Sequence, residues 1–285
     1  MPISRRNLLR ILAASCSPVF AQAPQGMASR GVKAARRAKF SGVPFHASLT
    51  DVARQAGLRE VVVSGHPERC DYITEAMGCG AAFFDYDNDT DLDLAIVNGD
   101  VIDNIDDLKD QRSYKQVNLL LQNDGSGKFK EVGPVSGPGF ALKKASRGLA
   151  VGDIDNDGDL DLLIANVGDT TDLLRNDGGN RQNSLLIRTV GTKSNRDGIG
   201  ARLRLTIGKK VLLRYVKAGS SYLSQNDLRV HFGLGSATRA DRLEILWPSG
   251  VVDEVLNIDA NQIVTVREGA GAVSQKEFSV ASVAR

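Results

Sequence analysis

The sequence predicts an all-β protein, and three observations support this. Its apolar segments are short and partly alternating, as in residues 81–84 and 92–97, which is typical of strands rather than helices. Glycine is abundant, with 29 of 285 residues, and aromatic residues make up only 5%. This composition favours short strands joined by tight turns. A hydrophobic content of 42% supports a core, and the length suits one large domain or two ordinary ones.

Residues 1–23 are predicted to form an export signal. The stretch Ser-Arg-Arg-Asn-Leu-Leu-Arg at residues 4–10 is similar to the twin-arginine signature, and Ala21-Gln22-Ala23 offers a small-x-small cleavage site. An ordinary Sec signal and a lipoprotein anchored through Cys16 are the alternatives. No stretch is long and apolar enough to span a bilayer, so no transmembrane segment is predicted. We therefore expect an exported protein, periplasmic or secreted.

The charge balance argues against a nucleic-acid partner. The whole chain has a formal charge of +2, but the predicted signal holds three arginines and no acidic residue. The rest of the chain is therefore close to neutral, without the basic excess that nucleic-acid binding requires. Residues 24–44 are small, basic and interrupted by Pro and Gly, and they are predicted to form a flexible lead.

Two acidic stretches, residues 85–93 and 153–161, are near copies with an aspartate at every odd position. Two like charges about 4 Å apart cost roughly 4 kcal/mol near a protein surface, so a loop that gathers them needs a cation. Oxygen ligands at this density suit Ca²⁺. The predicted side-chain ligands are Asp85, Asp87, Asp89 and Asp93 in the first loop and Asp153, Asp155, Asp157 and Asp161 in the second. Asp91 and Asp159 are predicted to offer their backbone carbonyl oxygens.

These loops differ from an EF-hand. The glutamate that an EF-hand needs at position 12 is replaced by Ile96 and Ile164, and the flanking segments read as strands instead of helices. Each loop is therefore predicted to join two strands. A solvated turn without metal is the alternative, because Asp and Asn favour turns on their own.

Other landmarks repeat with the loops. An Asn-Asp-Gly turn at residues 123–125 follows an apolar strand, and a second one at residues 176–178 follows the second loop. The irregular acidic segment at residues 99–117 is predicted to be a solvated excursion without an ion site.

The stretches GCGAAFFDYDNDTDLDLAIVNG and SRGLAVGDIDNDGDLDLLIANVG resemble FG-GAP/VCBS repeats. This resemblance implies integrin-α-like β-propeller blades with Ca²⁺ in each loop, over residues 45–179. The chain departs at loop position 6, where Thr90 stands in the first loop and the usual Gly158 in the second. If this position needs a positive φ, threonine costs roughly 1–2 kcal/mol, so the first site is predicted to bind Ca²⁺ more weakly.

Residues 180–270 are predicted to form a β-sandwich-like domain, and residues 271–285 a tail. Six candidate strands are separated by Gly-, Asn- and Asp-containing turns. The segments SNRDGIGARLRL, GSSYLSQND, VHFGLG and LEILWPSG resemble the ASPIC/UnbV domain. Together with the repeats, this makes the chain similar to the cartilage acidic protein-like family, which implies a secreted or exported setting but no particular reaction.

Two cysteines, Cys70 and Cys79, follow the signal, and in an exported protein such a pair favours a disulfide. A small packed Cys79 is the alternative. No catalytic residue is predicted: His231 and Asp227 accompany several serines, but no nucleophile elbow is present.

The predicted function is that of an exported calcium-binding module for binding or adhesion, with structural Ca²⁺ in both loops. The expected partners are a protein, a polysaccharide or a second copy of the chain. The alternative is a calcium-stabilised extracellular enzyme acting on a polymer. A propeller needs about four to eight blades, so two repeats predict a partial propeller whose open sides must be covered.

Overall fold

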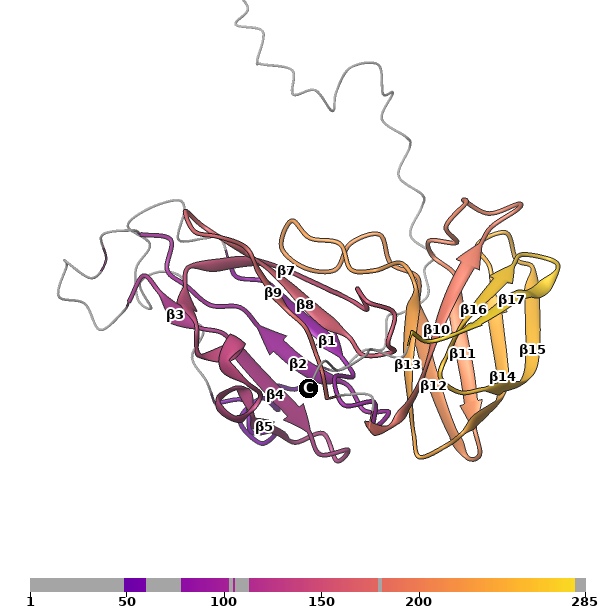
Figure 1. Ribbon diagram of the computed structural model, residues 1–285, viewed down its shortest axis with the longest axis horizontal. Helices are drawn as coiled ribbons and strands as arrows, with labels where there is room; N and C mark the ends of the chain where they lie inside the picture. The colour runs from indigo at the N-terminus through magenta and orange to yellow at the C-terminus, as the bar shows by residue number, and fades with distance from the viewer. Residues whose placement is uncertain (1–48, 60–77, 103–104, 106–112, 179–180, 280–285) are drawn as a thin grey trace, which may run out of the picture. The chain divides into compact units, whose positions relative to one another are not determined.

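A computed structural model describes residues 49–59, 78–102, 105, 113–178 and 181–279 (Figure 1). The predicted export signal, the lead at residues 24–44, Cys16 and Cys70 lie outside these ranges. Residues 51–285 form one compact unit, described below. The described residues form five sheets, none of them closed, which confirms the all-β class and the open arrangement of blades.

The first repeat is a four-stranded antiparallel sheet in the order β1-β2-β4-β5. Its strands are β1 (Ala81–Phe84), β2 (Asp93–Ile96), β4 (Leu119–Asn123) and β5 (Phe129–Glu131). The second repeat is a three-stranded antiparallel sheet of β7 (Ser146–Gly152), β8 (Asp161–Asn166) and β9 (Asp172–Leu174). Each acidic loop joins the first two strands of its sheet, as predicted.

Short elements connect the two repeats. The strands β3 (Gln116–Val117) and β6 (Lys143–Lys144) pair with each other. Two 3-10 helices, η4 (Gly133–Val135) and η5 (Pro138–Ala141), lie between β5 and β6. A proline occupies the first turn of each, where a missing N–H costs nothing.

The two repeats share one apolar core, because alternate side chains of each sheet point toward the other. Residues in or directly beside β1, β2, β4, β5, β7 and β8 form this cluster: Ala82, Phe84, Ala95, Val97, Leu120, Val132, Leu149, Val151, Leu160, Leu162 and Ile164. The packing of a sheet face from one repeat on a sheet face from the next is the arrangement expected of neighbouring propeller blades.

The opposite face of the first sheet is covered by the segment that precedes it. Leu94, Leu119 and Leu121 on this face pack with Leu58 and Phe129. The N–H of Phe129 donates to the carbonyl of Ala56 at 2.7 Å, which fastens the segment to β5. Gly57 makes this possible: its φ is +84°, and a Cβ there would collide with the carbonyl oxygen of Phe129. This face is therefore covered over β2 and β4, whereas Phe83 on β1 is 61% exposed.

The C-terminal domain is a sandwich of two four-stranded sheets, ordered β13-β10-β16-β17 and β12-β11-β14-β15. Its strands are β10 (Asn183–Val190), β11 (Arg202–Ile207), β12 (Lys210–Tyr215), β13 (Val230–Gly235), β14 (Arg239–Leu246), β15 (Val252–Asp259), β16 (Gln262–Arg267) and β17 (Gly271–Glu277). Inward-facing side chains of both sheets form a single core, which includes Leu185, Leu203, Phe232, Leu243 and Val264. Only β10 and β16 pair in parallel.

Two strands were not among the predicted ones. The strand β15 pairs with β14, and β17 pairs with β16 inside the segment predicted as a tail. Most side chains of β17 are exposed, so it lacks the alternation that reveals a half-buried strand. The sheet therefore continues past residue 270.

The single tryptophan of the chain lies in the sandwich core. Trp247 is 2% exposed, and its Nε1–H donates to Oδ2 of Asp253 at 2.7 Å. The same oxygen accepts the N–H of Gly269 at 2.7 Å, so the buried carboxylate ties β15 to the end of β16. Tryptophan fluorescence therefore reports on this domain alone.

Candidate metal centre

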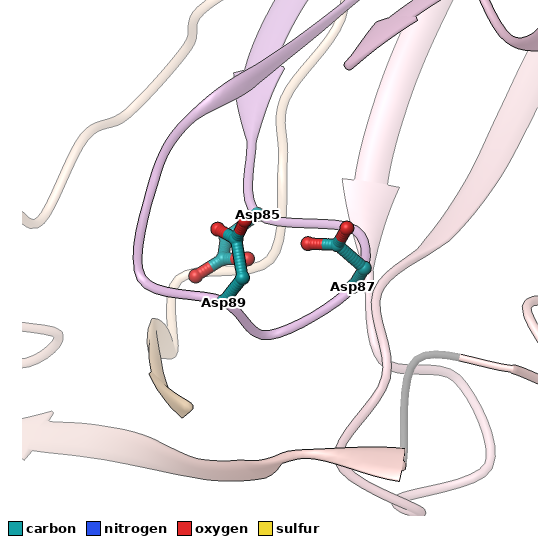
Figure 2. Close-up of side chains that lie close together, drawn as sticks. All are labelled: Asp85, Asp87 and Asp89. Atoms are coloured by element: carbon teal, nitrogen blue, oxygen red, sulfur yellow. The ribbon is translucent and has the colours of Figure 1, made fainter. Parts of the chain in front are cut away.

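The first acidic loop gathers three carboxylates directly after β1. Figure 2 shows the side chains of Asp85, Asp87 and Asp89 directed toward one another within the loop. One oxygen from each lies within 4.8 Å of the others. The N–H of Thr90 donates to Oδ2 of Asp85 at 2.9 Å, and the N–H of Asp91 donates to Oδ1 of Asp89 at 2.8 Å. These bonds bend the backbone around the cluster.

The second loop repeats this arrangement after β7. Asp153, Asp155 and Asp161 each bring one oxygen within 4.8 Å of the others. The N–H of Gly158 donates to Oδ2 of Asp153 at 3.1 Å, the counterpart of the Thr90–Asp85 bond. The N–H of Asp159 donates to Oδ1 of Asp157 at 2.9 Å, the counterpart of the Asp91–Asp89 bond. The two loops are therefore built alike.

The backbone of both loops takes the left-handed conformation at positions 4 and 6. Asn88 has a φ of 60° and Asn156 a φ of 62°, a region that asparagine tolerates better than most residues. Position 6 has a φ of 87° at Thr90 and 96° at Gly158. The predicted need for positive φ at this position is thus met in both loops, and Thr90 carries the strain.

The aspartates at position 9 tie each loop to the third strand of its sheet. Asp93 accepts the N–H of Tyr86 at 3.1 Å and the N–H of Asn123 at 2.8 Å. Asp161 accepts the corresponding N–H groups of Ile154 at 2.9 Å and Asn176 at 2.8 Å. The sequence shows the repeated Asn-Asp-Gly turns but not their contact with the aspartate at position 9. Each turn comes close to its loop only when the third strand pairs with the second.

Desolvation dominates the electrostatics of the loops. Burial, reinforced by Asp89 and other neighbouring carboxylates, raises the pKa of Asp85 to about 8. Burial likewise raises the pKa of Asp93 to about 7 and that of Asp161 to about 6. The charged forms are disfavoured because the carboxylates lose water and repel one another. A bound cation removes both penalties.

The residues fit a hard divalent ion. In the part of the chain that the structure describes, Oδ1 of Asp85, Oδ1 of Asp87 and Oδ1 of Asp155 are buried and accept no hydrogen bond. An orphaned buried carboxylate oxygen is costly unless it is paired or coordinates a metal. Clustered carboxylate oxygens are the donors that Ca²⁺ prefers. Both loops are therefore acidic clusters able to hold a metal ion.

The other predicted ligands lie outside the two clusters. The side chain of Asp91 accepts Nζ of Lys210 at 3.2 Å, and that of Asp159 accepts Nδ2 of Asn88 at 3.0 Å. Both were predicted to act through their carbonyl oxygens, and that assignment stays a prediction. Asp157 accepts the backbone N–H of Asp159 in its own loop, and Asp93 accepts the N–H groups of Tyr86 and Asn123.

The C-terminal domain packs against both acidic loops and hydrogen-bonds to their backbone. Arg229 donates to the carbonyl of Asp153 and to Oδ1 of Asn156, both at 2.6 Å. The hydroxyl of Ser184 donates to the carbonyl of Gly158 at 2.9 Å. At the first loop, the N–H of Gly235 donates to the carbonyl of Asn88 at 2.8 Å. These contacts join residues more than 20 positions apart, so no local pattern could reveal them.

His231 and Asp227, which lie near several serines in the sequence, make contacts at the second acidic loop. Nε2 of His231 lies 3.2 Å from the carbonyl oxygen of Gly158, and burial lowers its pKa to about 4. The carboxylate of Asp227 accepts Nε of Arg229 at 2.6 Å. Both side chains therefore support the second acidic loop.

Cys79 is half-buried and forms no disulfide with a described residue, and Nη1 of Arg147 donates to its Sγ at 3.3 Å. Burial raises the pKa of this thiol. The bridge to Cys70 stays a prediction, because Cys70 lies outside the described residues. Within the acidic segment predicted as solvated, Asp100 is buried and accepts the N–H of Ile102 at 3.0 Å, while Asp103, Asp106, Asp107 and Asp110 also lie outside the described residues.

Replacing Thr90 with glycine should strengthen Ca²⁺ binding at the first loop. Glycine adopts the φ of 87° without the roughly 1–2 kcal/mol that a Cβ costs there. Calorimetry in an Asp155→Asn background isolates the first site. Gly158→Thr is the matched reverse change and should weaken the second site, because its side chain would also collide with Phe278. An unchanged Ca²⁺ affinity in Thr90→Gly would show that position 6 is not responsible.

Comparison with known proteins agrees with this architecture. The FG-GAP-like repeat family model matches residues 85–164, and the ASPIC and UnbV family model matches residues 191–273. The chain is 28% identical to cartilage acidic protein 1 of Homo sapiens over 172 residues, which cover 58% of this chain and 24% of that protein.

Two further relatives carry the same name. Cartilage acidic protein 1 of Mus musculus is 28% identical over 189 residues, covering 64% of this chain and 27% of the relative. That of Xenopus tropicalis is 33% identical over 121 residues, covering 40% of this chain and 18% of the relative. The chain thus spans about a quarter of the length of these relatives, or less. The predicted resemblance is confirmed: the chain carries an FG-GAP-like repeat region followed by an ASPIC and UnbV domain, and it is similar to cartilage acidic protein 1.

Proposed function

We propose that this protein is an exported, calcium-stabilised interaction module without a catalytic role of its own. One observation carries the proposal: two strand-loop-strand units each gather three carboxylates whose buried oxygens are not all satisfied by hydrogen bonds. Such loops are stable at neutral pH when a cation holds them. The ion would lie among Asp85, Asp87 and Asp89 in the first loop and among Asp153, Asp155 and Asp161 in the second.

Calcium would act here on structure. It neutralises the loops, fixes the pairing of β1 with β2 and of β7 with β8, and holds both loops against the C-terminal domain. Extracellular calcium modules commonly bind with a Kd of about 10⁻⁴–10⁻³ M. Occupancy would therefore follow the calcium concentration outside the cell.

An exported setting is supported by the twin-arginine-like segment and by the similarity to cartilage acidic protein 1. No helix in the described ranges has the length and hydropathy of a membrane span. We propose a periplasmic or secreted location and a protein or polysaccharide partner.

Isothermal titration of the full chain with Ca²⁺ tests the metal part of this proposal. We expect two binding events, the weaker at the first loop, and one event in each of the single variants Asp87→Asn and Asp155→Asn. The exposed Glu277 at the edge strand β17 provides the control, and Glu277→Gln should retain both events. Absence of binding at millimolar Ca²⁺ would leave the loops as turns and overturn the proposal.

Partner binding is tested separately on arrays of extracellular proteins and polysaccharides. We expect binding in Ca²⁺ that is lost after chelation and in the double variant Asp87→Asn/Asp155→Asn. Binding that is indifferent to calcium would separate the interaction surface from the metal loops. Turnover of an arrayed polymer would favour the enzyme alternative.

A further inference from the structure

The two repeats correspond strand for strand, and the register of their sheets defines which faces are equivalent. In the first sheet, Ala82 pairs with Ala95, which pairs with Leu120. In the second sheet, Ala150 pairs with Leu163, which pairs with Leu173. Equivalent positions in the first two strands of the two sheets are 68 residues apart, which is also the spacing of the two acidic loops. We call these the first row and the second row.

The first row shows what this face of a repeat is built to do. Ala95 is 2% exposed and Leu120 is 3% exposed, because both pack into the core shared with the second repeat. The second repeat meets them with the opposite face of its sheet, which carries Leu149, Leu162 and Ile164. In the first repeat, this face of the sheet thus packs against an aliphatic face of the next sheet.

The second row has the same geometry, but its two leucines are open among the described residues: Leu163 is 46% exposed and Leu173 is 55% exposed. Ala150 is half-buried beside the segment that carries Asp227. Val167, in the turn after β8, is 49% exposed. Single exposed apolar side chains are ordinary, whereas a group aligned on one sheet face marks an interaction surface. Here the strand register places Leu163 and Leu173 at the positions that Ala95 and Leu120 occupy in the first repeat, where they are buried against the second repeat.

The edges of this sheet limit how a partner can approach. The outer edge of β7 is taken by a segment of the C-terminal domain: Asp227 donates its N–H to the carbonyl of Val151 at 2.9 Å, and Asn226 accepts the N–H of Val151 at 3.1 Å. Beside β9, Lys144 forms an ion pair with Asp172 at 2.6 Å. A partner therefore meets the face of the sheet, over the second row, and does not extend the sheet at β7.

We propose that two copies of this chain associate through this face, each packing its second row against that of the other. A head-to-tail arrangement would need the opposite face of the first repeat in the next copy. The middle of that face, over β2 and β4, is already covered, since Leu94, Leu119 and Leu121 pack with Leu58 and Phe129. The leucines of the second row are open among the described residues, and a two-fold axis makes this face self-complementary. This inference does not depend on the calcium proposal.

Sedimentation velocity of the full chain in Ca²⁺ at about 1–100 μM tests the dimer. We expect a reversible monomer–dimer equilibrium for the unchanged protein and monomer throughout for Leu163→Lys/Leu173→Lys. Leu256→Lys is the matched control: Leu256 lies on β15 and is 57% exposed, and this variant should dimerise like the unchanged protein. Tryptophan fluorescence and circular dichroism verify that all variants are folded.

Cross-linking adds a readout that does not depend on destabilising the face. Leu163→Cys places a thiol inside the proposed interface of each copy, so mild oxidation should yield a covalent dimer that Leu256→Cys does not form. The proposal is overturned by a monomer at every concentration, by a dimer that survives Leu163→Lys/Leu173→Lys, by a dimer that Leu256→Lys also abolishes, or by open-ended oligomers, which would indicate head-to-tail association. It is equally overturned if Leu163→Cys gives no more covalent dimer than the control.

Discussion

We expect removal of calcium to lower the melting temperature of this protein by about 10 °C or more. A ligand present at about 100 times its Kd stabilises the folded state by about 2.7 kcal/mol per site, so two sites contribute about 5 kcal/mol. For a protein of this size, 1 kcal/mol corresponds to a shift of roughly 2–4 °C. Both repeats and the sandwich should respond, because the loops are fastened to the C-terminal domain through Arg229 and Ser184.

The measurement is thermal melting of the full chain in about 10–100 mM Ca²⁺, which is about 100 times the expected Kd, and after chelation, followed by circular dichroism and by Trp247 fluorescence. Asp87→Asn and Asp155→Asn should each lose part of the calcium-dependent gain, and Glu277→Gln should keep all of it. A melting temperature that does not change on chelation would contradict a structural role for calcium. A shift in circular dichroism without a shift in Trp247 fluorescence would show that the loops are not coupled to the sandwich.

Without calcium, stability should fall as pH rises from about 5 to 8, the reverse of the usual acid sensitivity. Burial in the folded state raises the pKa of Asp85 to about 8, of Asp93 to about 7 and of Asp161 to about 6, from an ordinary value of 3.8. Folded molecules therefore bind more protons than unfolded ones in this window. That stabilisation is present at the acidic end and is lost as pH passes each folded pKa.

One buried group opposes this trend. Burial lowers the pKa of His231 to about 4, so the unfolded state binds the extra proton between about pH 4 and 6.5. Three carboxyl groups outweigh this single histidine, and each pKa unit corresponds to about 1.4 kcal/mol. The net loss across the window is therefore expected to be several kcal/mol. Saturating Ca²⁺ should reverse the slope, because the ion competes with protons for the same oxygens.

Melting temperatures in calcium-free and calcium-saturated buffers from pH 5 to 8 test this expectation. Asp85→Asn provides the sharpest variant, since it removes the carboxyl group with the largest shift without changing its shape. At pH 8 and without calcium it should melt higher than the unchanged protein, and with calcium it should melt lower. A calcium-free melting temperature that rises steadily over this range would contradict the desolvated state of the loops.

Short sequence patterns predicted the features of this protein that depend on residues close together in the chain. The carboxylate spacing placed the two loops, and the short apolar segments placed the strands on either side of them. The substitution of Thr90 for glycine marked a position of positive φ, which the structure shows at 87°. These features follow from residues within a dozen positions of one another.

The parts that pattern missed depend on distant contacts. The contacts of Arg229, Ser184 and Gly235 with the acidic loops form only when the sandwich packs against the repeats. The strand β17 is exposed on most of its side chains and carries no alternation. The open second row could be recognised only after the register showed that Leu163 and Leu173 are equivalent to the buried Ala95 and Leu120.

The presence of metal in the two loops is tested most directly by anomalous diffraction from crystals grown in Ca²⁺, recorded at a wavelength where calcium scatters anomalously. We expect two peaks, one coordinated by oxygens of Asp85, Asp87 and Asp89 and one by oxygens of Asp153, Asp155 and Asp161. A peak only in the second loop would mean that the strain at Thr90 disables the first. The absence of a peak in either loop, at calcium concentrations of several millimolar, would contradict the central claim that these loops are metal sites.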